Sequence, residues 1–142
     1  SSPVPRAYIP TDLWNSEKLS RSLAEIDRAI ESSQHSRAVT LTYSCLEGIY
    51  KTYIQKNVEL VASPSDLLGM AKIVKNDVLS KVRGESQAPE QIINSISTIT
   101  NAIANSRNGF SESHFDQDAQ KWLAVYARDL TNSIGRLLLH FV

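Results

Sequence analysis

Isoleucine recurs at helical spacing in the second half of this 142-residue sequence. Ile92, Ile96, Ile99 and Ile103 follow one another at steps of four, three and four residues. Because an α-helix has 3.6 residues per turn, these steps place the four side chains on one face. Isoleucine alone favours strands, but a helical period outweighs the intrinsic preference of single residues. The pattern therefore predicts a helix with Pro89 in its first turn and an inward isoleucine face.

The same period recurs along the rest of the chain. Apolar residues from Leu19 to Ile30 repeat at steps of four, three and four, and Thr11 or Asp12 can cap the helix that carries them. No run of alternating apolar and polar residues between turn dipeptides indicates a hairpin. The predicted helices cover about residues 12–31, 37–56, 64–83, 89–105 and 116–142. The fold prediction is an all-α, up-and-down bundle of four to five helices over residues 12–142, after an extended proline-containing lead-in at residues 1–11.

Apolar spacing also predicts which side chains face inward. In the second helix, aromatic residues at helical spacing indicate core positions rather than base-stacking ones, although Tyr43, Tyr50 and Tyr53 could stack bases. Trp14 and Trp122 are expected to pack at the edges of the core. In the last helix the predicted inward residues are Ala119, Leu123, Tyr126, Leu130, Ile134, Leu137 and Phe141.

Charge and cysteine content exclude several classes of function. Fifteen basic residues balance fifteen acidic ones, so bulk charge does not recognise nucleic acid or a membrane surface. No apolar run is long enough to span a bilayer. Cys45 is the only cysteine, which excludes an internal disulfide and a thiolate zinc site, and it fits a buried position in a cytoplasmic protein. No metal or cofactor motif is found.

One break between helices brings together residues that suit phosphate chemistry. Arg107 and Asn108 stand at the expected end of one helix, and His114 stands at the expected start of the next. Arginine supplies a planar cation that binds phosphate through two N–H groups, and histidine titrates near neutral pH. The alternative is structural: a helix-end arginine that bonds carbonyl groups and a first-turn histidine that faces solvent.

The segment resembles the motif of the HEPN superfamily. In that motif an arginine is followed by four to six residues, the first of them polar, and then by a histidine. HEPN proteins are helical bundles and often RNases. The chain most resembles the C-terminal domain of bacterial abortive-infection proteins, because Arg37, Leu46-Glu47 and Lys51 match the second helix of that family. The resemblance extends over about residues 12–142.

The resemblance implies metal-independent RNA cleavage in phage defence or in a toxin. The 2′-hydroxyl of the RNA would attack the adjacent phosphate, with His114 as general acid or base. Arg107 would stabilise the phosphate, and Asn108 would orient the histidine or the phosphate. Lys51, Glu47 and Arg37 would be substrate-side residues, although Glu47 and Lys51 could also form a simple surface pair four residues apart.

The resemblance also implies partners. HEPN RNases act as homodimers in which two motifs line one cleft, and an antitoxin or an effector domain upstream of Ser1 is expected. The proline-rich start without methionine fits a domain from a longer protein. Two alternatives stay open: a catalytically degenerate bundle that binds RNA or protein, and a purely structural dimerisation domain.

Overall fold

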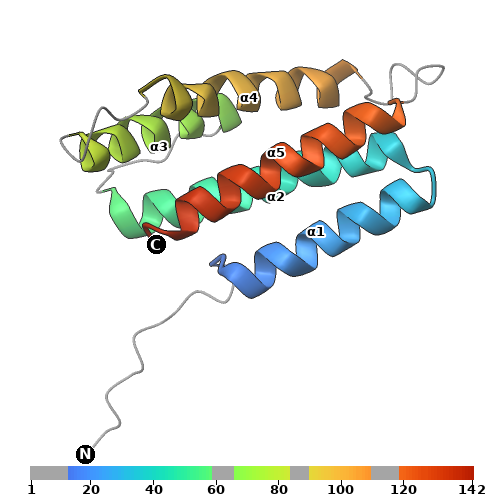
Figure 1. The fold of residues 1–142 in the computed structure, drawn as a ribbon, viewed down its shortest axis with the longest axis horizontal. Helices are drawn as coiled ribbons and strands as arrows, with labels where there is room; N and C mark the ends of the chain where they lie inside the picture. Colours follow the sequence, from blue (N-terminus) through green and yellow to red (C-terminus); the bar gives the residue numbers. More distant parts are fainter. Residues whose placement is uncertain (1–12, 59–65, 84–89, 110–118) are drawn as a thin grey trace, which may run out of the picture.

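The computed structural model describes residues 13–58, 66–83, 90–109 and 119–142. Five helices account for most of these residues, which contain no β-strand (Figure 1). The helices are α1 (Ser16–Glu31), α2 (His35–Asn57), α3 (Leu67–Val82), α4 (Glu90–Gly109) and α5 (Lys121–Leu139). The prediction of an all-α helical bundle is confirmed, whereas the lead-in at residues 1–11 lies outside the described residues.

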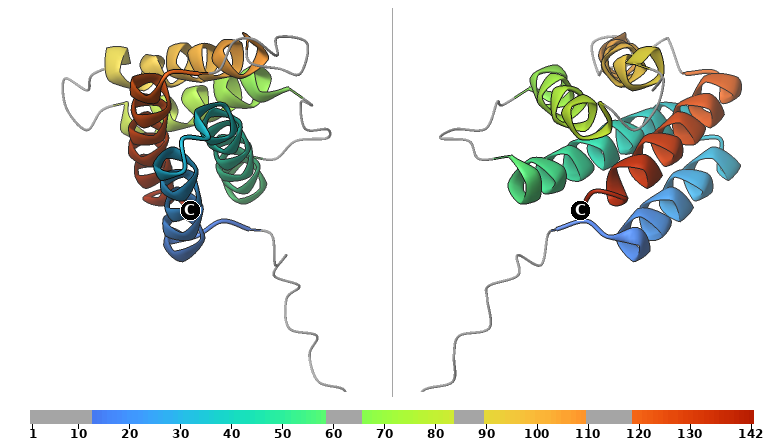
Figure 2. Two further views of the ribbon diagram at one scale, coloured as in Figure 1. Left: turned by 90° about the vertical axis from the view of Figure 1, so that its right-hand side faces the viewer. Right: turned by 60° about the vertical axis from the view of Figure 1, so that its left-hand side comes forward.

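The helices surround α2, which contacts each of the other four. α1 lies on one side of α2 and α5, and the pair formed by α3 and α4 lies on the other side (Figure 2). Contacts between residues show that α2, α3 and α5 run in one direction, and α1 and α4 in the other. Consecutive helices therefore alternate in direction as predicted for an up-and-down bundle, except that α2 and α3 are parallel. None of the described helices is long and apolar enough to cross a membrane.

Polar side chains join α2 to the α3–α4 pair inside the bundle. The Tyr50 hydroxyl lies 2.6 Å from Oγ1 of Thr100 on α4, and both residues are buried. The Tyr53 hydroxyl donates to Asp77 on α3, and burial together with this carboxylate raises the pKa of Tyr53. Both tyrosines are core residues, as the spacing predicts. Because each hydroxyl is buried with a partner, these bonds also fix the register of α3 and α4 along α2.

The buried face of α5 agrees with the predicted one in part, since Ala119 and Ile134 are buried and Leu123, Leu137 and Phe141 pack partly buried against the core. Its buried residues are Ala124, Ala127, Thr131, Ile134, Gly135 and Leu138. The predictions that Trp122 packs and that Tyr126 faces inward are wrong, since both side chains are exposed. Small side chains let two helix backbones approach closely, and this close approach determines the face that α5 buries.

Three helix ends also differ from the predicted ones. α1 begins at Ser16 after an Asn15 cap that accepts from the Lys18 N–H, so Thr11 and Asp12 do not cap it. α4 continues to Gly109 instead of ending near residue 105, and Arg107 and Asn108 lie in its last turn, at the helix end where they are predicted. α5 begins at Lys121 and not at Asp116. On α4 the inward face contains Ile93, Ile96 and Ile103, whereas Ile92 is exposed.

Cys45 is buried in α2, as predicted, and burial raises the pKa of its thiol to about 12. The folded protein therefore keeps a proton that the unfolded chain releases near pH 8.5, so stability is lost as pH rises from about 8.5 towards 12. We expect the free energy of unfolding in urea to include a fall of about 2 kcal/mol between pH 8 and pH 10 from this thiol. The Cys45→Ala variant should lack that part of the fall. An unchanged pH dependence in the variant would contradict this assignment.

Candidate functional site

Arg107 in the last turn of α4 lies over an aromatic ring of α2. Its guanidinium carbon is 4.2 Å from the centroid of the Tyr43 ring, and the arginine is exposed while the tyrosine is partly buried. Within the described ranges, no carboxylate forms an ion pair with Arg107. A guanidinium stacked on a ring keeps its N–H groups, which point outward in its plane, available to an anion.

A second contact brings the start of the last described range to the same side of α2. The backbone N–H of Ala119 donates to Oγ of Ser36, at 2.9 Å. Ser36 and Tyr43 are seven residues apart, which is two helical turns and about 10 Å along one face. Arg107 and Ala119, which lie on either side of His114 in the sequence, therefore both contact one side of that helix. His114 itself lies outside the described residues.

The other predicted site residues on α2 divide into two groups. Glu47 and Lys51 follow Tyr43 at steps of four, so the three side chains lie on neighbouring turns of one side of the helix. Oε1 of Glu47 is 3.7 Å from Nζ of Lys51; the lysine side chain is exposed and the glutamate side chain is partly exposed. Arg37 instead pairs with Glu25 of α1, at 3.3 Å between Nη2 and Oε1. The structure thus groups Arg107, Tyr43, Glu47 and Lys51, and it places Arg37 towards α1.

A small pocket lies between α2, at Lys51, and the start of α1. Its volume is about 180 Å³, and its lining includes Trp14, Lys18, Glu47 and Lys51. Gly48 makes room for the indole, because a Cβ atom at this position would lie 2.0 Å from Nε1 of Trp14. The backbone N–H of Trp14 also donates to Oγ1 of Thr52, at 2.8 Å. Lysine side chains therefore lie at this end of the pocket, and Arg107 stands about two turns away at Tyr43.

The grouped residues supply cations and hydrogen-bond donors. Asn108 is exposed and follows Arg107 in the last turn of α4, where its amide is a further hydrogen-bond donor. No group of three or more histidine, cysteine or acidic side chains suited to a metal ion occurs among the described residues. The arrangement can bind a phosphate group and stabilise negative charge on it.

The pairing of Arg107 with Tyr43 is not predicted by the sequence. Helical spacing makes Tyr43 a core residue or a base-stacking one. Its ring packs partly buried against the core, and it also supports an arginine from another helix. The available signal is the step of four from Tyr43 to Glu47 and from Glu47 to Lys51, which puts the tyrosine beside two candidate site residues.

Comparison with known proteins gives no relative for this chain. It matches no protein-family model, no curated protein and no solved structure.

Proposed function

We propose that this domain is a metal-independent endoribonuclease of the HEPN type that acts in the cytoplasm, in phage defence or as a toxin. The observation that supports it best is the exposed Arg107 guanidinium, stacked on Tyr43 and without a carboxylate partner among the described residues. The helical bundle that carries this arginine in the last turn of α4 is compatible with the HEPN resemblance. RNA is the proposed substrate.

In this proposal Arg107 binds the scissile phosphate. Stacking on Tyr43 restricts the guanidinium before the substrate arrives, so little side-chain freedom remains to be lost on binding. Its N–H groups then donate to the non-bridging phosphate oxygens, where negative charge increases in the transition state. Asn108 adds a donor beside it.

His114 completes the reaction by moving a proton. The 2′-oxygen of the RNA forms a bond to phosphorus while the bond from phosphorus to the 5′-oxygen breaks. His114 takes the proton from the 2′-hydroxyl or gives one to the leaving 5′-oxygen. The products are a 2′,3′-cyclic phosphate and a 5′-hydroxyl, and the atoms balance without a co-reactant.

Lys51, Glu47 and Arg37 have supporting roles in the proposal. Lys51 contacts a neighbouring phosphate of the RNA, because it lies two turns from Tyr43 on the same side of α2. Glu47 holds Lys51 through the 3.7 Å ion pair. Arg37 has the smallest role, since its ion pair with Glu25 offsets most of its positive charge. The proposed partners are a second copy of the chain and an antitoxin or upstream effector domain.

Removing the stacked arginine tests the proposal. We expect Arg107→Ala to lower the rate of RNA cleavage in EDTA by about 100-fold to 1000-fold, because a donor to the transition-state phosphate is lost. Arg107→Lys should recover only a small part of the activity, since an ammonium keeps the charge but cannot reproduce the planar stack. The measurement is the amount of cyclic-phosphate product from a labelled single-stranded RNA.

Arg136 provides the matched control. It also lies exposed in the last turn of a helix, where it donates to Asn132, so Arg136→Ala removes the same charge from a comparable position. Cleavage by this variant should equal that of the unchanged chain. Equal activity in the Arg107→Ala variant would contradict the proposal, and RNA binding without product from the unchanged chain would favour a degenerate bundle that only binds.

A further inference from the structure

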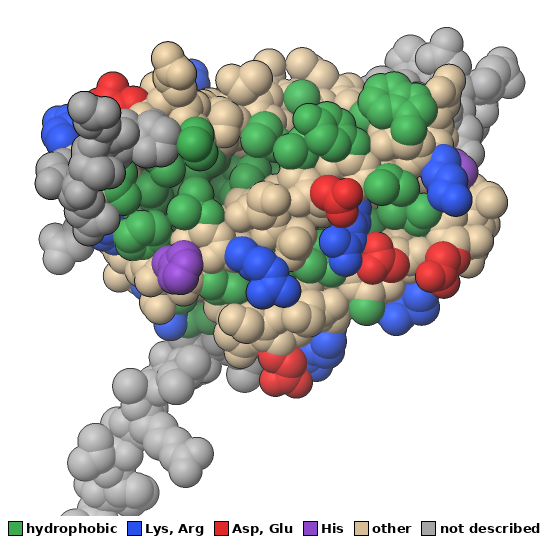
Figure 3. All heavy atoms as spheres, in the orientation of Figure 1, with side chains coloured by type: hydrophobic (Ala, Val, Ile, Leu, Met, Phe, Trp, Pro, Cys, Tyr) green, Lys and Arg blue, Asp and Glu red, His purple; other side chains and the backbone are tan. Residues whose placement is uncertain are grey.

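The outer face of α5 exposes three large apolar residues near its start. Trp122 is 64% exposed and Tyr126 is 58% exposed, and Val125 lies between them in the sequence. Their steps of three and four residues place them on one face of the helix. In the view of Figure 3, hydrophobic side chains appear in the region of α4 and α5, with acidic and basic side chains beside them.

The indole of Trp122 is held on this surface by its own chain. Its Nε1–H donates to Oε1 of Gln120, at 2.7 Å, so the polar edge of the ring is bonded while the rest is exposed. Tryptophan and tyrosine are among the residues that contribute most to binding at protein interfaces. An adjacent exposed Trp, Val and Tyr therefore form a candidate interaction surface.

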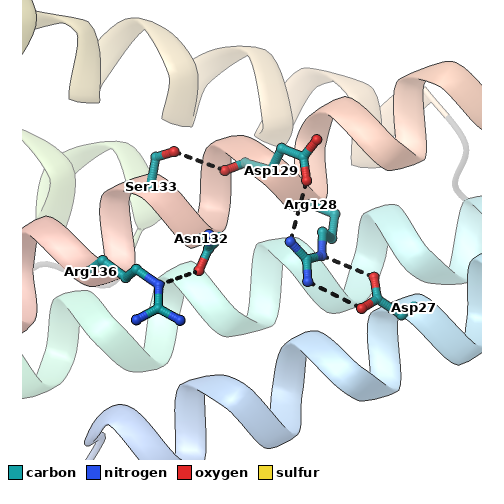
Figure 4. Close-up of polar contacts among 6 residues, drawn as sticks. All are labelled: Asp27, Arg128, Asp129, Asn132, Ser133 and Arg136. Carbon is teal, nitrogen blue, oxygen red and sulfur yellow. Dashed lines mark hydrogen bonds and ion pairs between the residues drawn. The ribbon is translucent and has the colours of Figure 1, made fainter.

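Two charges on the same face indicate which partner fits. Lys121, Val125 and Asp129 follow one another at steps of four, so a positive and a negative side chain lie one turn before and one turn after Val125. Asp129 is fixed by Nη1 of Arg128 at 3.3 Å, and Arg128 in turn bonds both carboxylate oxygens of Asp27 on α1 (Figure 4). The face thus carries a lysine one turn before Val125 and an exposed carboxylate one turn after it, and this carboxylate also pairs with Arg128 of its own chain.

We propose that α5 pairs with α5 of a second copy of this chain, antiparallel and about a two-fold axis at Val125. In this pairing Lys121 of each copy faces Asp129 of the other, and the exposed Trp122 and Tyr126 side chains of both copies become buried between the helices. A two-fold axis makes the same patch serve both partners, so every contact occurs twice. The charge order along α5 suits this antiparallel arrangement and opposes a parallel one, in which like charges would meet.

The proposed pairing is independent of the RNA chemistry. Ile49 of α2 faces α5, because a Cβ atom at Gly135 would lie 3.0 Å from Cδ1 of Ile49. Tyr43 points about 120° away from Ile49 around the axis of α2. The Arg107–Tyr43 contact therefore does not face the proposed interface. A pair formed through α5 therefore leaves the Arg107 side chains of both copies accessible.

The mass of the chain in solution, measured without RNA over a wide concentration range, tests this inference. The unchanged chain should reach twice the 15.8 kDa of one chain. Trp122→Ala should weaken the association about 100-fold. Lys121→Asp and Asp129→Lys should each weaken it about tenfold, because each puts like charges opposite one another in both contacts. The reversal Lys72→Asp, at an exposed position on α3, should change nothing.

Mixing the two charge-reversed variants gives the decisive measurement. Lys121→Asp and Asp129→Lys chains should associate with each other as strongly as the unchanged chain associates with itself, which also shows that both are folded. The double variant should likewise regain self-association. A chain that stays at one-chain mass at every concentration would overturn the inference, whether or not Trp122 then binds RNA. So would single reversals that leave the association unchanged.

Discussion

Replacing Gly135 with leucine is expected to destabilise the domain by about 3 kcal/mol, because the bundle has no room for a side chain at this position. A Cβ atom there would already lie 3.0 Å from the methyl carbons of Ile49 and Leu19. All three residues are buried where α5, α2 and α1 meet, so the added carbons force the helices apart. The measurement is the free energy of unfolding in urea.

The same substitution at an exposed position of α5 isolates the effect of the close contact. Ser133→Leu, two residues earlier, adds a comparable side chain where there is room, and it should change the free energy of unfolding by less than about 0.5 kcal/mol. If Gly135→Leu unfolds at the same urea concentration as the unchanged chain, the close approach of the three helices at Gly135 is refuted.

Replacing His114 with alanine is expected to reduce RNA cleavage by about 100-fold to 10,000-fold while leaving RNA affinity nearly unchanged. The reason is that in the proposed mechanism His114 transfers the proton, whereas Arg107 and Lys51 bind the phosphates. The rate of the unchanged chain should depend on pH with an inflection near the pKa of a histidine, and that inflection should disappear in the variant. The measurement is single-turnover cleavage in EDTA across neutral pH.

His140 offers a control of the same residue type. It lies immediately after α5, far along the chain from the motif, so His140→Ala should keep both the rate and the pH profile. Retained cleavage in His114→Ala would exclude His114 from the reaction. Loss of affinity together with cleavage would instead assign it a binding role.

The helical fold could be predicted from sequence because the spacing of apolar residues is set within each helix by itself. The isoleucines of α4 and the stripe of α1 each specify a helix without reference to the rest of the chain. Only part of the face that α5 buries could be predicted in this way. A hydrophobic pattern favours Tyr126 and Leu130 over Ala127 and Thr131, but only the neighbouring helices determine how closely α5 approaches.

The candidate site could likewise be predicted only in part, because some of its contacts depend on how the helices pack. Arg107 could be identified from the sequence, since a motif of residue types contains it. Its support by Tyr43 could not, because the two residues are 64 positions apart in the chain and meet only after α4 packs against α2. The separation of Arg37 from the group also depends on packing, since its partner Glu25 belongs to α1.

The position of α5 has a consequence for the order in which the chain is made. α5 packs along α2 and against α1, yet its residues 121–139 are synthesised after those of every other described helix. Ile49 and Leu19 therefore lack their partner helix on the ribosome until this last segment emerges. Nascent chains with apolar faces exposed in this way bind chaperones or aggregate. Closing the bundle is thus a late event in synthesis, and slow translation of the last helix would prolong the exposed state.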